Sequence, residues 1–143
     1  MDELVDGFRY DLWANRLWLD FLASQGFPQP ESLIFQHLLA AQEIWLLRFG
    51  GASPSAMPTP ELSHATLQRI HDGWVEALKS EDRVVEYRRT TGEPGSRLLS
   101  EIAKHVVNHG TYHRGEMRGI CRGRGEDGFP ETDLISYSFA VRP

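Results

Sequence analysis

The chain has 143 residues, enough for one domain with a single substantial core, and we expect residues 1–143 to fold as one domain. Its 41% hydrophobic and 24% charged residues exclude a disordered chain, and it has no apolar run near the roughly 20 residues of a transmembrane helix, which excludes a membrane-spanning protein. A net charge of −5 argues against nucleic acid and anionic membranes as partners.

The first predicted helix covers residues 4–25 and carries apolar residues on two faces. Both faces repeat at steps of three and four, which is typical of a helix packed in a bundle. The faces are Phe8, Leu12, Asn15, Leu19 and Leu22, and Tyr10, Trp13, Leu17 and Phe21. A helix that is apolar on two sides is either central or covered by another subunit, so we expect a homodimer.

A turn over residues 26–30 separates this helix from a second one, which starts near Glu31 or Ser32 and ends at Arg48. The Ser-, Thr- and Pro-rich residues 52–60 predict a loop, and a third helix is expected over residues 61–79.

Residues 83–91 (RVVEYRRTT) form the one stretch with β character, ahead of a strong turn signal at 92–95. They predict a short strand or extended arm. A fourth helix is expected from residue 96 to about 122. The tail over 129–139 is expected to be an ordered cap in which four side chains are buried: Leu134, Ile135, Tyr137 and Phe139. Four long helices joined by modest loops predict an all-α four-helix bundle.

The last of these helices carries three histidines at steps of four: His105, His109 and His113. Residues four apart are rotated by about 40° and rise roughly 6 Å, whereas His105 and His113 are about 12 Å apart along the axis. Two imidazoles one turn apart can therefore share an ion that lies about 2.1 Å from one nitrogen of each ring. Two pairs meet this condition: His105 with His109, and His109 with His113. Two neighbouring histidines on an inward face are costly to bury without a common partner. We predict that His109 and His113 supply two ligands of a buried divalent-metal site.

A third ligand must come from another helix, and two histidines compete for that role. His37 lies among Ile34 and Ala41, which predicts an inward ring, and His71 lies on the same side of its helix as Trp74. Periodicity ranks His37 only slightly above His71, so both remain open at this point.

Several other residues are candidates for the site, although none is identified as catalytic. We expect Asn15 to be buried and bonded to backbone or to the second nitrogen of a ligand histidine. His105 is expected to be a pocket residue beside the ligands, with acid–base work as a second interpretation. Arg114, Arg118 and Arg122 recur every four residues and predict a basic edge, which either offsets the negative end of the helix dipole or anchors an anionic substrate or thiol cofactor.

The single cysteine, Cys121, cannot form an internal disulfide, and we expect it to be a small buried filler. The acidic start MDELVDGF lacks the features of a signal peptide. We therefore expect a cytoplasmic protein.

Four segments together resemble one known family. They are YDLWANRLW at 10–18, FQHLLAAQEIWLLRFGG at 35–51, HVVNHGTYHRGEM at 105–117, and Pro-x-Thr-Asp-Leu-Ile at 130–135. This set resembles the DinB/YfiT-like superfamily of bacterial metalloenzymes, named for induction by DNA damage. Glu116 departs from the family pattern, in which glutamine is more usual after His-Arg-Gly. This added carboxylate either accepts a proton near the site or lies at the surface beside Arg114 or Arg118, and we expect the surface position.

The resemblance implies an antiparallel four-helix bundle, commonly dimeric, with a divalent ion bound by His37, His109 and His113. Three nitrogen ligands without a protein carboxylate leave open positions and suit Zn, Ni or Fe(II). The implied function is that of a metal-dependent transferase or hydrolase, in which the ion activates a bound low-molecular-weight thiol or water for S-transfer, isomerisation or hydrolysis of a small-molecule substrate. The alternative is a non-catalytic, metal-binding stress-response or regulatory dimer.

Overall fold

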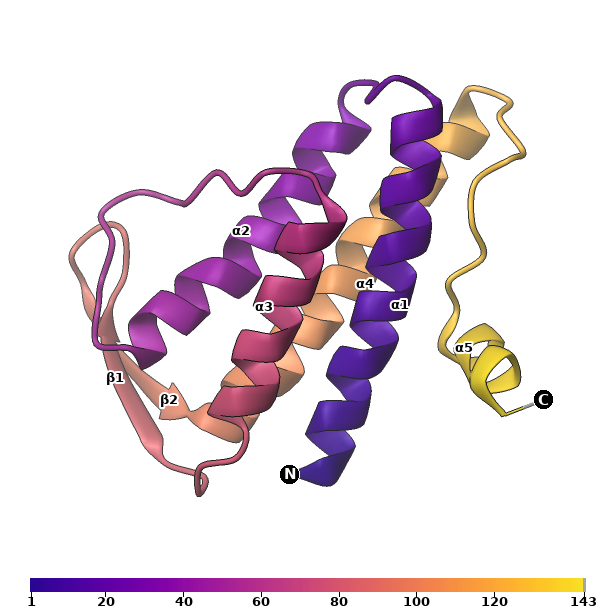
Figure 1. Cartoon of the computed structure of the whole chain (residues 1–143). Helices are drawn as coiled ribbons and strands as arrows, with labels where there is room; N and C mark the ends of the chain where they lie inside the picture. Colours follow the sequence, from indigo (N-terminus) through magenta and orange to yellow (C-terminus); the bar gives the residue numbers. More distant parts are fainter. Residues whose placement is uncertain (143) are drawn as a thin grey trace.

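The computed structural model describes residues 1–142, which form a bundle of four long helices (Figure 1). They are α1 (Asp2–Ser24), α2 (Glu31–Phe49), α3 (His64–Ala77) and α4 (Leu99–Gly123). An antiparallel hairpin of β1 (Val84–Arg88) and β2 (Pro94–Leu98) connects α3 to α4, and a short helix, α5 (Leu134–Val141), follows the bundle. The predicted all-α bundle with an extended arm before its last long helix is confirmed.

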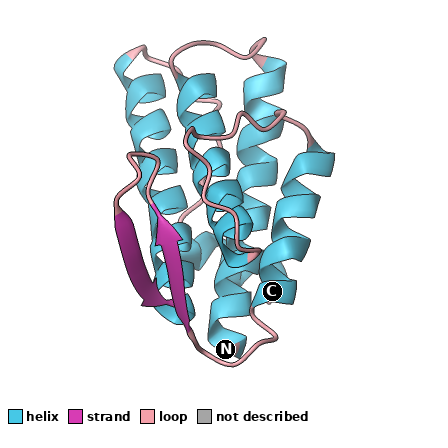
Figure 2. Ribbon diagram, turned by 90° about the vertical axis from the view of Figure 1, so that its left-hand side faces the viewer, coloured by secondary structure: helices cyan, strands magenta, loops and turns pink. Residues whose placement is uncertain are grey.

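The helices pack in the order α1, α3, α2, α4 around the core. Two antiparallel pairs result, α1 with α3 and α2 with α4, because the long connection after α2 returns the chain to the opposite end of the bundle (Figure 1). The hairpin lies along one edge, against the end of α2 and the start of α4 (Figure 2). The α2–α4 pair is the one that positions the histidines.

Two helix starts differ from the sequence prediction, each for a local reason. Helix α3 begins at His64 and not at residue 61, because the Ser63 hydroxyl accepts a hydrogen bond from the Thr66 amide at 3.2 Å and caps the helix there. Helix α4 begins at Leu99 and not at residue 96, because Pro94–Leu98 pairs with β1. Glu101 then caps α4 by accepting the Leu98 amide at 3.1 Å.

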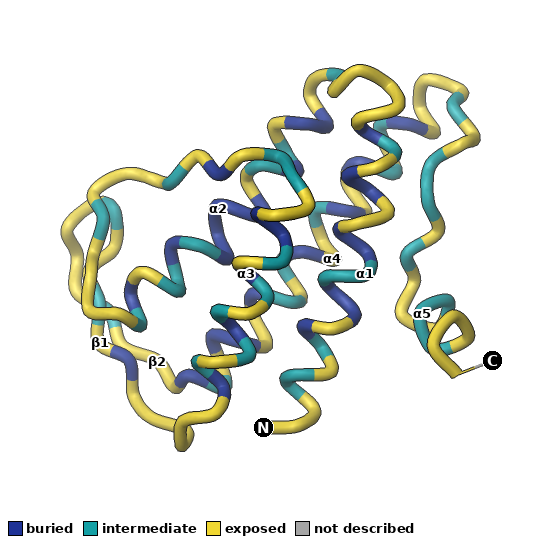
Figure 3. Tube along the Cα trace, viewed as in Figure 1, coloured by how far each residue is buried: buried dark blue, intermediate teal, exposed yellow. Residues whose placement is uncertain are grey.

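The core is built from one face of each long helix, with Val85 of the hairpin added (Figure 3). Its largest fully buried side chains are Trp18, Trp74, Phe8, Phe35, Leu22, Leu38, Leu39, Ile44, Ile70, Leu99 and Met117. The buried face of α4 contains Val106, Gly110 and Arg114. Gly110 and Arg114 each follow one of the histidines predicted to face inward, His109 and His113, by one residue, so the buried face is rotated around the helix by about one residue position. The histidines therefore flank the core and do not belong to it.

The tail is ordered as predicted, but the expected burial of its side chains is wrong. Leu134, Ile135 and Phe139 are 59%, 58% and 69% exposed. Only Tyr137 packs well, with its ring 5.8 Å from that of Tyr10 on α1. Helix α5 touches the bundle on one side only, so three of the four apolar side chains have nothing to cover them within residues 1–142.

Within residues 1–142, none of the helices combines the length and the apolar character that crossing a bilayer requires.

Candidate metal centre

The three histidines implied by the resemblance lie together, contributed by two helices. His109 and His113 are one turn apart on α4, with ring centroids 4.4 Å apart, and His37 of α2 lies 5.2 Å and 4.9 Å from them. One nitrogen from each ring lies within 4.8 Å of the others. The Nε2 atoms of His109 and His113 are 3.1 Å apart, close to the spacing of about 3.3 Å expected for two nitrogens bound tetrahedrally to zinc.

The antiparallel packing of α2 on α4 brings His37 to this position. His71, the competing histidine, lies on α3 beside a small cavity that Asp11, Asn15 and Gln42 also line. It is therefore on another side of the bundle, and no sequence period could have shown which helix faces α4.

The prediction of a buried site is wrong in its degree of burial. His37 is exposed, and His109 and His113 are of intermediate exposure. The reason is the rotation of the buried face of α4. Gly110 and Arg114 face the interior, and the side of the helix that carries His109 and His113 is open to solvent. An open edge suits a catalytic site more than a structural one, because a substrate can reach it.

The electrostatics of the cluster favour neutral rings, which is the form that binds metals. Burial, and then the charges that His113, His37 and His105 would carry, lower the pKa of His109 from 6.5 to about 4. Burial against its neighbours, followed by His113, also lowers the pKa of His37, although Glu116 opposes this shift. At neutral pH His37 and His109 therefore present unprotonated nitrogens.

Glu116 supports the cluster from one side. Its Oε2 lies 2.9 Å from Nδ1 of His113, the nitrogen that faces away from His109. A carboxylate at this place accepts the Nδ1 proton and directs Nε2 toward the other rings. The side chain of Glu116 is 46% exposed, in line with the expected surface position, but its partner is His113 and not Arg114 or Arg118. The i, i+3 spacing of the two residues is the signal that could have revealed this pair.

His105 continues the row of rings along α4. Its centroid lies 5.5 Å from that of His109, and its side chain is exposed. It lines a cavity of about 270 Å³ next to the cluster, as expected for a pocket residue beside the ligands.

Asn15 and Arg114 do not reach the histidine cluster, because they belong to a buried polar network between α1, α2 and α4. Nη1 of Arg114 donates to Asp11 Oδ1 and to Asn15 Oδ1, each at 2.7 Å. Asp11 Oδ2 accepts from Asn15 at 3.0 Å and from Gln42 at 2.6 Å. The expectation that Asn15 bonds backbone or a ligand histidine is therefore corrected: its partners are a carboxylate and a guanidinium.

The predicted basic edge of α4 is also divided by the tertiary structure. Arg114 is 2% exposed and turned inward to Asp11, whereas Arg118 pairs with Glu131 of the tail at 3.0 Å and Arg122 is exposed. Steps of four drift around a helix, so the three residues do not share one environment. Asp11 and Gln42 are the members that sequence reasoning missed.

A second group of possible ligands, Glu31, Cys121 and Glu126, lies at the far end of α4. Here Arg124 already pairs with the buried carboxylate of Glu31. Burial, followed by a hydrogen bond that the thiol donates to Glu126, raises the pKa of the Cys121 thiol to about 11. A protonated thiol and a paired carboxylate oppose metal binding, so the histidine cluster is the better candidate, and Cys121 is a buried filler as expected.

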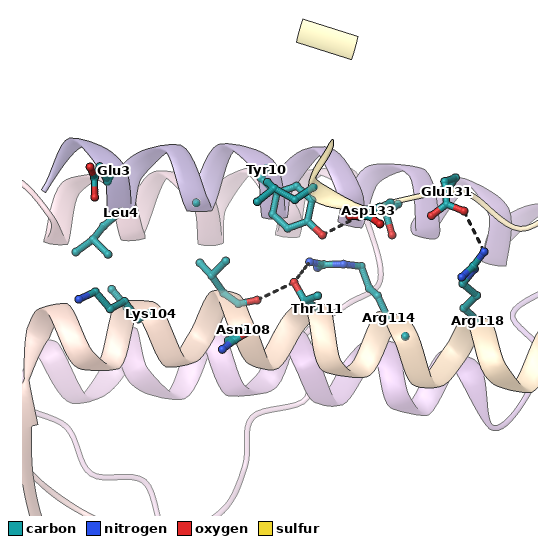
Figure 4. Close-up of a pocket in the computed structure, with 16 residues that line it drawn as sticks. Glu3, Leu4, Tyr10, Lys104, Asn108, Thr111, Arg114, Arg118, Glu131 and Asp133 are labelled. Carbon is teal, nitrogen blue, oxygen red and sulfur yellow. Dashed lines mark hydrogen bonds and ion pairs between the residues drawn. The ribbon is translucent and has the colours of Figure 1, made fainter. Parts of the chain in front are cut away.

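Another cavity lies on a different side of α4, against α1 and the tail (Figure 4). It measures about 580 Å³. In this view Lys104 and Thr111 lie on the side of α4 that faces α1, and Arg118 bonds Glu131 at one end. These positions are offset from His109 and His113 around the helix, so this cavity is separate from the metal centre.

Comparison with known proteins identifies a family. A family model described as "DinB family" matches residues 5–139. A segment of 44 residues is 46% identical to "Protein DinB" of Bacillus subtilis (strain 168), and the match covers 31% of this chain and 25% of that protein. The chain thus spans about a quarter of the length of this curated relative. No solved structure matches the chain.

Proposed function

The chain belongs to the DinB family, and from that membership we propose that it is a divalent-metal-dependent enzyme whose ion is held by His37, His109 and His113. The observation that carries this proposal is that three imidazole nitrogens from two helices lie within 4.8 Å of one another. A hydrophobic or purely structural role would not require three histidines to converge at an open edge of the bundle.

The chain's own groups support a catalytic site in three ways. The lowered pKa values of His37 and His109 keep both rings neutral at neutral pH, so that one nitrogen of each ring has a free lone pair. Glu116 orients the ring of His113. Three neutral donors leave positions open for a reactant.

A divalent ion in this place would supply Lewis-acid activation of a bound thiol or of a water, as required for thiol-dependent transfer or isomerisation, or for hydrolysis. The residues around it would position the small-molecule reactant and limit the access of water. His105 lies one turn from His109 and lines the adjoining cavity, which makes it the first side chain available to contact such a reactant.

This cavity favours an enzyme over a non-catalytic stress-response or regulatory protein, because a metal that only stabilises the fold needs no adjoining pocket. Assembly as a homodimer is part of the proposal. The exposed apolar side chains of α5 support it, since a second copy would cover them.

The test is metal analysis of the untagged protein, together with titration of the metal-stripped protein with Zn²⁺, Ni²⁺ and Fe²⁺. We expect one ion per chain at pH 7 and its loss in His109→Ala. His64→Ala is the matched control, because His64 lies on the surface beside Asp20, away from the cluster. A wild-type protein that binds none of these ions stoichiometrically contradicts the proposal. Addition of a low-molecular-weight thiol to the Co²⁺-loaded protein then separates the two chemistries: a thiolate-to-cobalt charge-transfer band supports thiol activation, and its absence favours water.

A further inference from the structure

A cavity of about 270 Å³ lies between the end of α2, the hairpin and the start of α4. Its lining consists of Trp45, Tyr87, Arg97, Glu101, Ile102 and His105. Figure 1 shows the hairpin closing this side of the α2–α4 pair. The cavity is large enough for a small planar molecule or for part of a larger substrate.

The cavity is a continuation of the histidine cluster along the two helices. Trp45 follows His37 by eight residues on α2, and Glu101 precedes His109 by eight on the antiparallel α4, a distance of about 12 Å along each axis. His105 lies between the two regions, with its ring 5.5 Å from that of His109. One molecule can therefore have its reacting end at the histidines and its other end in the cavity.

Two aromatic rings in the cavity wall are held rigidly. Trp45 and Tyr87 meet edge to face with centroids 4.7 Å apart. The guanidinium of Arg48 lies 4.4 Å from the centroid of Trp45 and 4.9 Å from that of Tyr87, and these cation–π contacts stabilise the positions of both rings. Preorganised aromatic surfaces of this kind favour planar, apolar groups.

The guanidinium of Arg97 is the group in this cavity that can bind an anion. Among residues 1–142, no carboxylate lies within 4 Å of the guanidinium of Arg97 or of Arg48, although Arg48 is only 9% exposed. Arg97 donates one hydrogen bond to the Ser96 carbonyl at 2.7 Å and has further donors free. Glu101 also lines the cavity, and its Oε2 accepts a hydrogen bond from the Leu98 amide at the amino end of α4.

We infer that this cavity, the Trp45–Arg97 groove, binds the planar, carboxylate-bearing part of a small substrate, with its plane against Trp45, its edge toward Tyr87 and its carboxylate on Arg97. The inference rests on the proposed function only in placing the reacting end at the histidines. The groove's own residues are sufficient for the binding itself, so binding does not require the ion.

The test uses the full chain labelled with nitrogen-15, both metal-stripped and zinc-loaded, titrated with trans-cinnamate and with its neutral amide. The reporters are the indole N–H signals, with Trp45 assigned through Trp45→Phe. Trp18 and Trp74 are 0% exposed and serve as internal references. We expect cinnamate to shift the Trp45 signal and leave the references in place, in both forms of the protein. The amide is expected to bind about tenfold more weakly, because it lacks the charge-assisted bond to Arg97.

Arg97→Gln is the decisive variant and Arg89→Gln its matched control, since Arg89 is an equally exposed arginine of the same hairpin that faces Glu93 and does not line the groove. We expect about tenfold weaker cinnamate binding in Arg97→Gln and an unchanged affinity in Arg89→Gln. Equal effects of the two variants, equal affinities for acid and amide, or a Trp45 signal that does not move would each overturn the inference. If the protein binds zinc but not cinnamate, the groove inference fails and the proposed function stands. If the protein binds cinnamate but no metal, the proposed function fails and the binding role of the groove stands.

Discussion

Nδ1 of His113 lies 2.9 Å from Oε2 of Glu116, while Nε2 of the same ring points toward His109. The carboxylate and the rest of the cluster thus contact opposite nitrogens of one imidazole. This arrangement fixes which nitrogen is available to a metal, because a proton held on Nδ1 leaves the Nε2 lone pair free.

Removing the Glu116 carboxylate should therefore weaken metal binding without removing a ligand. We expect Glu116→Ala to reduce zinc affinity by about 10- to 100-fold, measured by competition with a chromophoric chelator. Glu76→Ala, an exposed glutamate of α3 paired with Lys79, is the control and should leave the affinity unchanged. Equal zinc affinities in Glu116→Ala and the wild type would show that the carboxylate is only a surface charge.

The lowered pKa of His109 makes the stability of the metal-stripped protein depend on pH. Its folded-state pKa of about 4 lies below the unfolded value of 6.5, so between these values the unfolded chain binds more protons. The free energy of unfolding should therefore fall as pH falls from about 6.5 to 4, with His109 contributing roughly 1–2 kcal/mol after allowance for solvent screening. Urea denaturation at pH 7 and pH 4.5 measures the fall, and His109→Gln should make it smaller. A fall of the same size in His109→Gln would assign the pH dependence to other groups.

The pair formed by Asp11 and Arg114 is buried, with side chains 4% and 2% exposed. Asp11→Ala leaves a guanidinium inside the bundle without its carboxylate, and we expect it to lower the free energy of unfolding by about 3–5 kcal/mol. Glu131→Ala removes the exposed partner of Arg118 and should cost less than about 1 kcal/mol. Chemical denaturation of the two variants tests the contrast, and a small effect in Asp11→Ala would mean that water reaches Arg114.

Gly110 is the place where α4 approaches this network most closely. A Cβ atom there would lie 2.6 Å from Oδ1 of Asp11 and 3.0 Å from Nη1 of Arg114. We expect Gly110→Ala to destabilise the fold by about 1–3 kcal/mol in spite of alanine's higher helix propensity. Gly119→Ala on the same helix meets open space and should stabilise it by about 0.5–1 kcal/mol. Thermal unfolding midpoints that move in opposite directions would bear out this contrast, and midpoints that rise together would contradict it.

Much of the fold follows from local patterns in the sequence. The four long helices were predictable because their apolar residues recur at the helical period, and the hairpin because a β-rich stretch precedes Gly92, which takes a φ of +89° in the turn. The convergence of His109 and His113 was predictable for the same reason, since residues four apart share one side of a helix.

Periodicity limited the site to neighbouring histidines of α4 and left His37 and His71 as rivals for the third position, and only the family resemblance implied His37. Only the tertiary structure shows that His37 lies beside the pair and that His71 does not, because the packing of α2 against α4 depends on long-range contacts that no local period encodes. The same packing turned Arg114 inward and the histidine edge outward. Periodicity defines which residues share a face, and the neighbour that covers the face determines whether it becomes core or site.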